Sequence, residues 1–278
     1  MPELPEVETT KKGIAPHVEG AIVSAVVVRQ PKLRWPVTPG LDSLLIGKRL
    51  LKVERRAKYL LLDFGEGWLL IHLGMSGSLR VLTIDTELKK HDHIDISFTD
   101  PEDNRSIILR YHDPRRFGAV LWIPDHWSIH PLLAKLGPEP LTDAFNKEYL
   151  YNKMRTLRTP IKTTIMDQSV VVGVGNIYAS ESLFSSKIHP QQPANTLSVE
   201  DCELLVREIK QTLQLAIQSG GSTLRDYVNS AGDTGYFQHV FKVYDRAGEG
   251  CVVCSKPIEL IRLGQRSTFF CSNCQSLR

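Results

Sequence analysis

Four cysteines near the C-terminal end of the chain constrain its fold more than any other feature. They form two Cys-x-x-Cys pairs with sixteen residues between the pairs: Cys251, Cys254, Cys271 and Cys274. Each pair can bring two thiolates to one turn, and the intervening length suits a β-hairpin that returns the second pair to a tetrahedral site. Four thiolates fill every position, so we expect one structural Zn²⁺ per chain and no catalytic metal or organic cofactor. Two disulfides are the alternative, which a reducing compartment disfavours.

The composition is that of an ordinary folded protein. The 278 residues are 42% hydrophobic and 23% charged, which is long enough for two or three domains. No apolar run approaches the ~20 residues of a membrane span. The first residues also lack the apolar segment of a secretory signal, so we expect a cytoplasmic protein. The net charge of +3 identifies no partner, and a nucleic-acid site has to be sought in local clusters.

Hydrophobic patterning changes character twice along the chain. Between residues 20 and 123, short β-rich runs alternate with turn signals: AIVSAVVVRQ, YLLLDFG, WLLIHLG, HIDISFT, SIILRY and GAVLW. These runs predict a β-sandwich. Helical periodicity follows, with candidate helices at 143–157, 161–168, 177–186 and 198–219. Cys202 lies within the last candidate, where we expect it to serve as a small apolar filler.

These changes of pattern define the expected domains. We predict a multi-domain α+β fold with an N-terminal β-sandwich and flanking helices at 1–134, a helical domain at 135–239 and a β-hairpin zinc finger at 240–278. The stretch GPEPLTD, at 137–143, has the composition of a hinge between the first two domains.

The opening stretch MPELPEVETT has two interpretations. If Met1 is removed, Pro2 carries a secondary amine, and an ordinary α-amino group has a pKa of roughly 8. Such an amine is a nucleophile near neutral pH. The same letters also describe an ordinary helix start, with proline in the first turn and acids close to the N-terminus. Taken alone, the stretch favours the helix interpretation.

Two basic stretches of the β-rich part suit contact with an anion. RRAKYLLLD places Lys58 at the entrance of an apolar strand, where alternation would send Lys58 and Tyr59 to opposite faces. A strand edge protected by lysine is the alternative. DPRRFGAV places Arg115 and Phe117 on a turn that begins at proline, which suits a phosphate contact beside an aromatic wedge. A turn stabilised by Asp113 explains this second stretch equally well.

A glycine-rich stretch precedes one of the candidate helices. VVVGVGNIYASESLF joins an apolar run to a helix through two glycines and places Asn176 at the helix N-terminus. Backbone N–H groups at such a terminus can bind an anion. The stretch is not a dinucleotide-binding fingerprint, because it lacks the third glycine and the surrounding strand–helix–strand unit.

Together these motifs resemble those of the bacterial formamidopyrimidine-DNA glycosylases, also called 8-oxoguanine-DNA glycosylases, the family that includes endonuclease VIII. The resemblance runs nearly end to end and is carried by PELPEVET, RRAKYLLL, HLGMSG, KHDH, DPRRFG, GVGNIYASE and GQRSTFFCSNC. It implies a β-sandwich, a helical domain with a helix-two-turns-helix motif, and a zinc finger, with DNA crossing between the domains. The opening PELPEV is more similar to the purine-directed branch than to the endonuclease VIII branch.

The resemblance also implies a reaction. Pro2 would attack C1′ of the damaged nucleotide, and Glu3 would donate a proton as the sugar ring opens. The resulting iminium permits β-elimination and then δ-elimination, which cut the strand on both sides of the lesion. Lys58 matches the lysine assigned to proton transfer in β-elimination, and Arg266 matches the arginine assigned to δ-elimination and phosphate binding.

The same resemblance implies a set of DNA contacts. The damaged nucleotide must leave the helical stack, at a cost of a few kcal/mol. Met75, Arg115 and Phe117 match the residues that fill the vacated space, and Arg115 would bond to the unpaired cytosine. Four residues match backbone-contacting positions: His72, His91, Lys162 and Asn176.

Two further segments follow from the resemblance. Residues 220–238 match the loop that covers the flipped base. Where relatives carry several lysines, this chain reads MRTLRTPIKTT, so Arg155 or Arg158 must make the corresponding DNA contact, and we assign it to Arg158.

The implied function is base excision repair by a bifunctional glycosylase and lyase directed at oxidised purines. The partner would be double-stranded DNA with oxidised bases or abasic sites, bound by a monomer in the bacterial cytoplasm, without a membrane. Two alternatives remain open: a lyase of the same family directed at oxidised pyrimidines, and a non-enzymatic zinc protein that senses DNA damage. The sensor would have no need of Pro2 and Glu3, which favours the enzyme.

Overall fold

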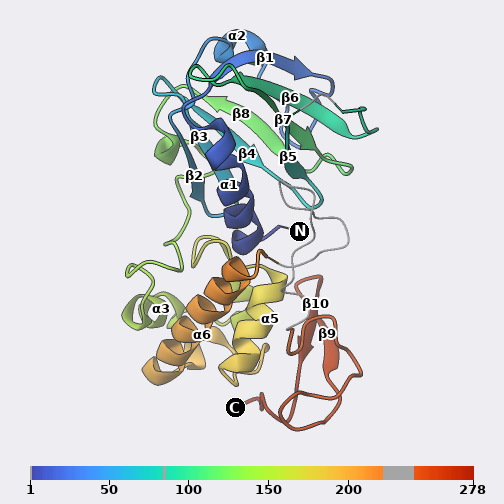
Figure 1. The fold of residues 1–278 in the computed structure, drawn as a ribbon. Helices are drawn as coiled ribbons and strands as arrows, with labels where there is room; N and C mark the ends of the chain where they lie inside the picture. The colour runs from blue at the N-terminus through green and yellow to red at the C-terminus, as the bar shows by residue number, and fades with distance from the viewer. Residues whose placement is uncertain (1, 84–85, 222–240) are drawn as a thin grey trace. The chain divides into compact units, whose positions relative to one another are not determined.

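The computed structural model describes residues 2–83, 86–221 and 241–278. The chain divides into two compact units (Figure 1). The first unit contains the described residues up to Ala134 together with Gly220 and Gly221, and the second contains Lys135–Ser219 and residues 241–278. Within these described ranges, no helix combines the length and apolar character needed to cross a membrane.

Two four-stranded antiparallel sheets form the first unit, which confirms the predicted β-sandwich. One sheet has the order β1-β6-β7-β5, made of β1 (Ile22–Val28), β5 (Ser78–Leu82), β6 (Asp92–Thr99) and β7 (Ser106–His112). The other has the order β2-β3-β4-β8, made of β2 (Lys52–Arg56), β3 (Tyr59–Asp63), β4 (Trp68–His72) and β8 (Ala119–Ile123).

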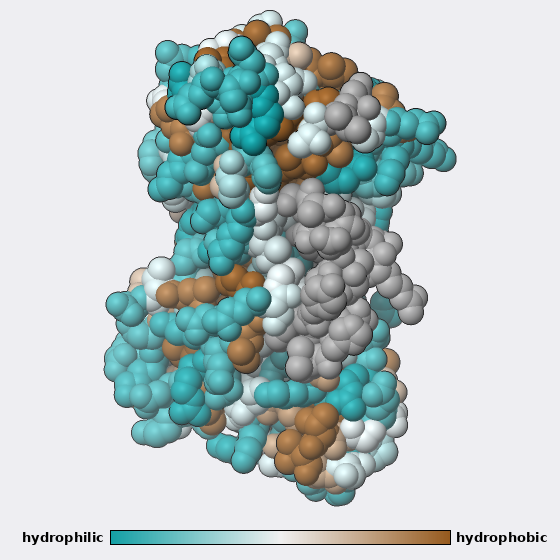
Figure 2. Space-filling view, viewed as in Figure 1, coloured by the Kyte–Doolittle hydropathy of each residue, from teal (hydrophilic) through white to brown (hydrophobic). Residues whose placement is uncertain are grey.

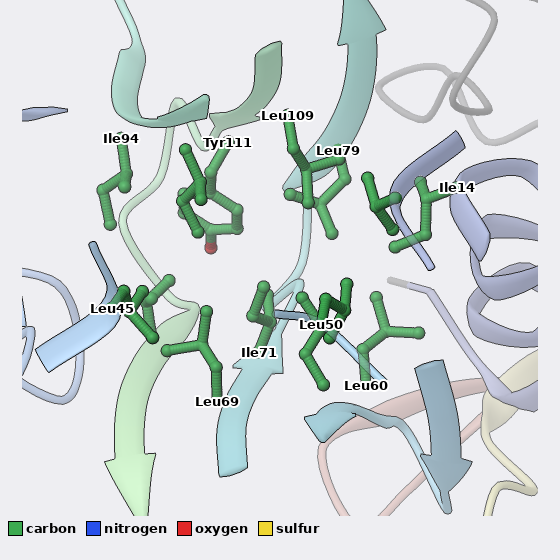
Figure 3. Close-up of a cluster of buried hydrophobic side chains, with 14 of the residues drawn as sticks. Ile14, Leu45, Leu50, Leu60, Leu69, Ile71, Leu79, Ile94, Leu109 and Tyr111 are labelled. Carbon is green, nitrogen blue, oxygen red and sulfur yellow. The ribbon is translucent and has the colours of Figure 1, made fainter. Parts of the chain in front are cut away.

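The hydrophobic core lies between the two sheets. Apolar side chains of one sheet face those of the other in two opposed rows (Figure 3). Leu60 and Leu62 of β3 belong to this core, whereas Leu61 between them points to the opposite face, as the period of a strand requires. Helices α1 (Leu4–Val18) and α2 (Leu41–Leu45) contribute Ile14 and Leu45 to the same core.

Three elements of the first unit are absent from the sequence-based prediction. Strand β2 reads KVERR and has a single apolar residue, the buried Val53, so its hydrophobic pattern is too weak to detect. Strand β5 reads SLRVL and follows a turn closely. Helix α2 has only five residues, too few for helical periodicity to be visible.

Helices are the main regular elements of the second unit. They are α3 (Lys147–Met154), α4 (Ile161–Met166), α5 (Asn176–Ser185) and α6 (Val199–Gln218), accompanied by the hairpin of β9 (Glu259–Leu263) and β10 (Arg266–Phe270). Short 3₁₀ helices lie at Trp127–Ile129 in the first unit and Ala194–Thr196 in the second. All four predicted helices are present. The face shown in Figure 2 carries hydrophilic residues together with separate hydrophobic patches on each unit.

Helix ends in the second unit have local causes. Asn146 caps α3 by accepting a hydrogen bond from the Tyr149 N–H, so this helix begins later than the predicted residue 143. Ser198 and Asp201 form a reciprocal capping box at the start of α6. Cys202 is fully buried in α6, and burial followed by two neighbouring acids raises its pKa to about 11. It therefore remains a thiol that fills space, as predicted.

Candidate functional site

The start of helix α1 holds the first two residues of interest. Glu3 is the N-cap residue: its side chain accepts a hydrogen bond from the Glu6 N–H, while Glu6 Oε2 accepts the Glu3 N–H at 2.8 Å. Glu3 is 2% exposed and Glu6 is fully buried. Chain ends usually fray, but this reciprocal cap fixes Pro2 and Glu3 on a rigid helix. The helix interpretation of the opening stretch is thereby confirmed.

A glycine approaches this helix start closely. Gly221 has a φ of +84°, and a Cβ atom at this position would lie 3.3 Å from Cγ and Oε1 of Glu6. Both the backbone conformation and the space therefore favour glycine. Of the predicted loop at 220–238, only Gly220 and Gly221 lie within the described residues.

Lys58 lies in the turn between β2 and β3. Arg56 pairs with Tyr59, so Ala57 and Lys58 are the two residues of a tight hairpin turn, and Ala57 has a φ of 54°. The predicted strand alternation therefore does not apply to Lys58, because the chain reverses there before the strand begins. Only 8% of Lys58 is exposed.

Arg55 ties this turn to helix α1. Its Nε donates to Glu8 Oε2 at 2.8 Å, and its Nη1 donates to the Ala57 carbonyl at 2.9 Å. Burial alone would raise the pKa of Glu8, but the hydrogen bond and charge of Arg55 outweigh burial, and the pKa lies below its usual value. The ion pair thus fixes the Lys58 turn against the helix that carries Glu3.

His72, at the end of β4, lies in positively charged surroundings. Burial, then the charges of Lys58 and Arg34, lower its pKa to about 4, so the imidazole is neutral at pH 7. Its Nδ1 accepts the Gly74 N–H at 3.1 Å, which places the ring proton on Nε2. Tyr59 packs against the ring with centroids 4.9 Å apart. The structure therefore groups Lys58 and His72 with Arg34 and Tyr59.

Arg34 was not identified from the sequence. It lies in the stretch RQPKLRWPV together with Arg29 and Lys32, so a local basic cluster was the signal that could have identified it. The pairing of β3 with β4 places Tyr59 opposite His72. Arg34, in the segment between β1 and α2, lies close enough for its charge to lower the pKa of His72.

The predicted insertion residues lie on two loops. Arg115 and Phe117 are exposed on the turn after β7, and the Arg115 guanidinium lies 4.8 Å from the centroid of the Phe117 ring. Met75 is half-buried in the turn after β4. Asp113 accepts the Arg115 and Gly118 N–H groups, so the structural interpretation of this turn is also correct.

His91 lies in a cluster of three imidazoles. Its ring makes edge contacts with His93 and His112, with centroids 6.1 and 6.0 Å apart. His112 in turn bonds to Asp92 through Nδ1 at 2.8 Å. His91 is partly exposed beside this cluster.

Lys162 is the central residue of a second cluster, in the helical unit. The residue is 1% exposed. Its ammonium group donates to Asn176 Oδ1 at 2.7 Å, to the Ser267 carbonyl at 3.0 Å and to Thr268 Oγ1 at 2.7 Å. Asn176, the first residue of α5, also donates to the Ser267 carbonyl. Lys162 thus lies inside the unit, where it holds Asn176 and β10; its direct contact with a DNA backbone stays a prediction.

Arg266 and Arg158 are exposed in the same unit. Arg266 begins β10 after the two-residue turn of Gly264 and Gln265, which have φ values of 52° and 62°. Two positive φ values are typical of the tight turn that joins a twisted hairpin. A cavity of about 390 Å³ between this turn and α4 is lined by both Lys162 and Arg266.

The four paired cysteines come together at the base of this hairpin. Their sulfur atoms all lie within 4.8 Å of one another, with 3.9 Å between Cys251 and Cys274 and 3.4 Å between Cys254 and Cys271. These distances exceed a disulfide bond, and four thiolates with Zn–S bonds of about 2.3 Å require sulfur separations of this size. The disulfide alternative is therefore wrong, and the site fits one tetrahedral zinc ion.

Comparison with known proteins identifies the family. Three family models match: the formamidopyrimidine-DNA glycosylase N-terminal domain over residues 1–120, its H2TH domain over 136–228, and the zinc finger found in FPG and IleRS over 248–277. This chain belongs to the formamidopyrimidine-DNA glycosylase family. Formamidopyrimidine-DNA glycosylase of Edwardsiella ictaluri is 54% identical over 275 residues, covering 99% of this chain and 100% of that protein.

Solved structures of the glycosylase family have the same fold. MutM (Fpg) of Thermus thermophilus is 37% identical with a TM-score of 0.88, and all of both chains is covered. Fpg of Lactococcus lactis, solved in complex with abasic-site DNA, is 35% identical with a TM-score of 0.89, covering 99% of each chain. The helix-two-turns-helix region of this glycosylase contains α4 and α5, and its zinc finger contains β9 and β10.

Proposed function

We propose that this glycosylase excises oxidised purines, both formamidopyrimidines and 8-oxoguanine, from double-stranded DNA and cuts the strand at the resulting abasic site. The observation that carries the proposal is the reciprocal cap between Glu3 and Glu6, which holds Pro2 and Glu3 rigidly at the start of α1. The cap by itself explains why Glu3 is buried, but a reacting amine at Pro2 also needs an acid held close to it, and Glu3 is the adjacent residue.

Pro2 is the proposed nucleophile. With Met1 attached, its nitrogen is part of an amide, so removal of Met1 must come first. The free amine forms a bond from nitrogen to C1′ and loses its proton to the departing base, whose bond to C1′ breaks with the electron pair leaving on the base. Glu3 then donates a proton to the sugar ring oxygen as the ring opens, which leaves an iminium between Pro2 and C1′.

Lys58 and Arg266 act in the proposed elimination steps. The iminium accepts electrons, which acidifies the hydrogen on C2′, so a base can remove it and expel the 3′ phosphate. Lys58 is the candidate for this proton transfer, because Arg55 fixes its turn against the helix of Glu3. Arg266 is proposed to bind phosphate and promote the second elimination. Zinc would hold the hairpin of Arg266 and take no part in the chemistry.

The remaining predicted contacts would position the duplex. We propose that Met75, Arg115 and Phe117 fill the space left by the flipped nucleotide. We propose contacts with the DNA backbone for five further residues, two in the first unit and three in the second: His72, His91, Arg158, Lys162 and Asn176. The imidazole of His72 is neutral and carries its proton on Nε2, so it would donate an uncharged hydrogen bond from Nε2 to a phosphate oxygen. We further propose three domains, at 1–134, 135–239 and 240–278, and a bacterial cytoplasmic location.

One experiment tests the proposal against both alternatives. The protein is incubated with duplex that contains 8-oxoguanine opposite cytosine, with borohydride present to reduce the iminium to a stable amine. We expect a covalent protein–DNA adduct, with no adduct for a form that retains Met1. Binding without excision would favour the damage sensor, and stronger activity on a duplex with an oxidised pyrimidine would favour the pyrimidine-directed enzyme. Equal trapping by the Met1-retaining form would show that Pro2 is not the nucleophile.

A further inference from the structure

The carboxylate of Asp113 is an unusually well-connected group in the first unit. It is fully buried and accepts hydrogen bonds from the Gly118 N–H at 2.9 Å and the Arg115 N–H at 3.2 Å. The Tyr111 hydroxyl donates to it at 3.1 Å, and the Ser76 hydroxyl lies at 3.5 Å. A buried carboxylate needs donors around it, and these come from different loops.

The Tyr111 hydroxyl lies between two of the loops. It has one proton and two acceptors in reach, Asp113 Oδ2 at 3.1 Å and the His72 carbonyl at 3.2 Å. The charged acceptor makes the stronger bond. Burial, followed by the charge of Asp113, raises the pKa of Tyr111 well above its usual value, so the hydroxyl keeps its proton.

Glycines close the space around this hydroxyl. A Cβ atom on Gly118 would lie 1.8 Å from it, and one on Gly77 would lie 3.2 Å from it. A Cβ on Gly74 would lie 2.6 Å from the Gly118 backbone nitrogen. The turn that carries Met75 and the turn that carries Phe117 therefore touch through their backbones, directly around the Tyr111 and Asp113 side chains.

The backbone of Asp113 extends the connection to the histidine cluster. Its N–H donates to the His91 carbonyl at 3.1 Å. Its carbonyl lies 2.8 Å from Nε2 of His93, and since a carbonyl only accepts, the ring must donate there. Asp113 thus bonds to both neighbouring segments and to its own turn.

We propose that Tyr111 and Asp113 form one positioning unit that sets Met75, Arg115 and Phe117 in a single arrangement for insertion into DNA, and thereby sets the preference for cytosine opposite the lesion. This inference rests on the proposed function. None of the three insertion side chains needs to contact Tyr111 itself, because the hydroxyl and carboxylate fix the backbones that carry them. Arg115 can recognise the opposite base only if its guanidinium is placed accurately. A small shift of the backbone should therefore reduce the discrimination between cytosine and adenine before it reduces other activities.

The test replaces Tyr111 by phenylalanine, which deletes one hydroxyl and leaves the ring. The matched control is Tyr149→Phe, since the Tyr149 hydroxyl also donates to one buried acceptor, the Val170 carbonyl at 2.9 Å, but lies in the second unit. The ratio of kcat/KM for 8-oxoguanine opposite cytosine to that opposite adenine is measured for each protein. Cleavage of single-stranded abasic DNA, which has no opposite base, is measured in parallel, together with the melting temperature.

We expect Tyr111→Phe to lower the cytosine-to-adenine ratio by about 10-fold, the size typical of losing a hydrogen bond to a charged group. Its cleavage of single-stranded abasic DNA should equal that of the wild type, and Tyr149→Phe should preserve the ratio. An unchanged ratio in Tyr111→Phe would overturn the inference, as would an equal loss in all assays, which indicates general destabilisation. Wild-type protein that fails on both duplexes would instead contradict the proposed function itself.

Discussion

Two buried ionisable side chains, Glu3 in the first unit and Lys162 in the second, are held in opposite ways. Glu3 is fixed by a cap with Glu6, three residues further along the chain. Lys162 is fixed by Asn176, fourteen residues away, and by Thr268, 106 residues away. A local arrangement survives wherever its own helix forms, whereas a distant one depends on the packing of several elements. Predictions that separate these two classes are given from the largest expected effect to the smallest.

Removal of zinc should have the largest effect, because the metal connects two cysteine pairs that lie on either side of the β9–β10 hairpin in the sequence. Structural zinc contributes roughly 10 kcal/mol to the folding of a small finger. We expect chelation to unfold the β9–β10 hairpin, displace Arg266, and abolish duplex binding together with excision. Duplex affinity measured before and after chelation checks this, with re-addition of zinc as the control. Full-strength binding by metal-free, inactive protein would contradict a structural role for the metal.

Glu3→Gln tests the local arrangement. Glutamine keeps the volume and an oxygen that can accept the Glu6 N–H, but it cannot donate the proton that the proposed mechanism needs. We expect excision of 8-oxoguanine to fall by about 100-fold or more, with binding to damaged duplex nearly unchanged. Single-turnover excision and duplex affinity are the measurements. A similar melting temperature shows that the cap persists, and unchanged excision would refute the role of Glu3.

Lys162→Met tests the distant arrangement. The change removes the donor to Asn176 Oδ1 and Thr268 Oγ1, while the Ser267 carbonyl keeps its hydrogen bond from Asn176. Relief of the buried charge offsets only part of that loss. We expect the free energy of unfolding to fall by about 2 kcal/mol, measured by urea denaturation. The matched control is Lys147→Met, because Lys147 forms an exposed pair with Glu203 at 3.1 Å, and a pair screened by solvent contributes little to stability. Equal losses of unfolding free energy in the two variants would show that the buried hydrogen bonds of Lys162 stabilise the protein no more than an exposed ion pair does.

Arg266→Ala, with zinc retained, should change binding more modestly. Loss of one phosphate contact reduces the slope of log affinity against log salt concentration by about 0.9. Strand cutting should decline more than base excision, because the arginine is proposed to act in elimination. Arg262→Ala, at an exposed position on β9, is the control. The same slope change in both variants would mean that overall finger charge, and no specific contact of Arg266, is responsible.

Substitution of Glu8 should have the smallest effect. Glu8 has one partner that is close in the sequence and one that is distant. It pairs with Lys11 three residues away at 3.2 Å and with Arg55, 47 residues away, at 2.8 Å. Its pKa is depressed in the folded protein, so its contribution is present above its ordinary pKa of 4.5 and is lost as pH falls through the lower folded value. Glu8→Gln should therefore cost about 1 kcal/mol at pH 7 and less at pH 3.

Urea denaturation at the two pH values measures this contribution, and single substitutions of its partners divide it. Arg55→Met should cost more than Lys11→Met, because the Arg55 side chain is 11% exposed and the Lys11 side chain is 31% exposed. A larger loss of unfolding free energy in Lys11→Met than in Arg55→Met would show that the partner close in the sequence stabilises Glu8 more than the distant one.

The sequence alone determined several features that rest on short spacing. The Cys-x-x-Cys pairs predicted the clustered thiols, the acids after Pro2 predicted the start of α1, and the glycines before Asn176 predicted the start of α5. Each cysteine pair and each helix start lies within a few residues, so the geometry of one turn decides that part of the outcome.

Only the tertiary structure decided the arrangements that join distant segments. It placed Lys58 in a turn held by Arg55 and Glu8, and it brought Arg34 beside His72. It also buried the ammonium group of Lys162, which the sequence shows only as one cation among several. The sequence shows which residues are polar, but a polar group can be buried only where the fold supplies its hydrogen-bond partners. Those partners are selected when sheets and helices pack, because burial requires each donor to find an acceptor.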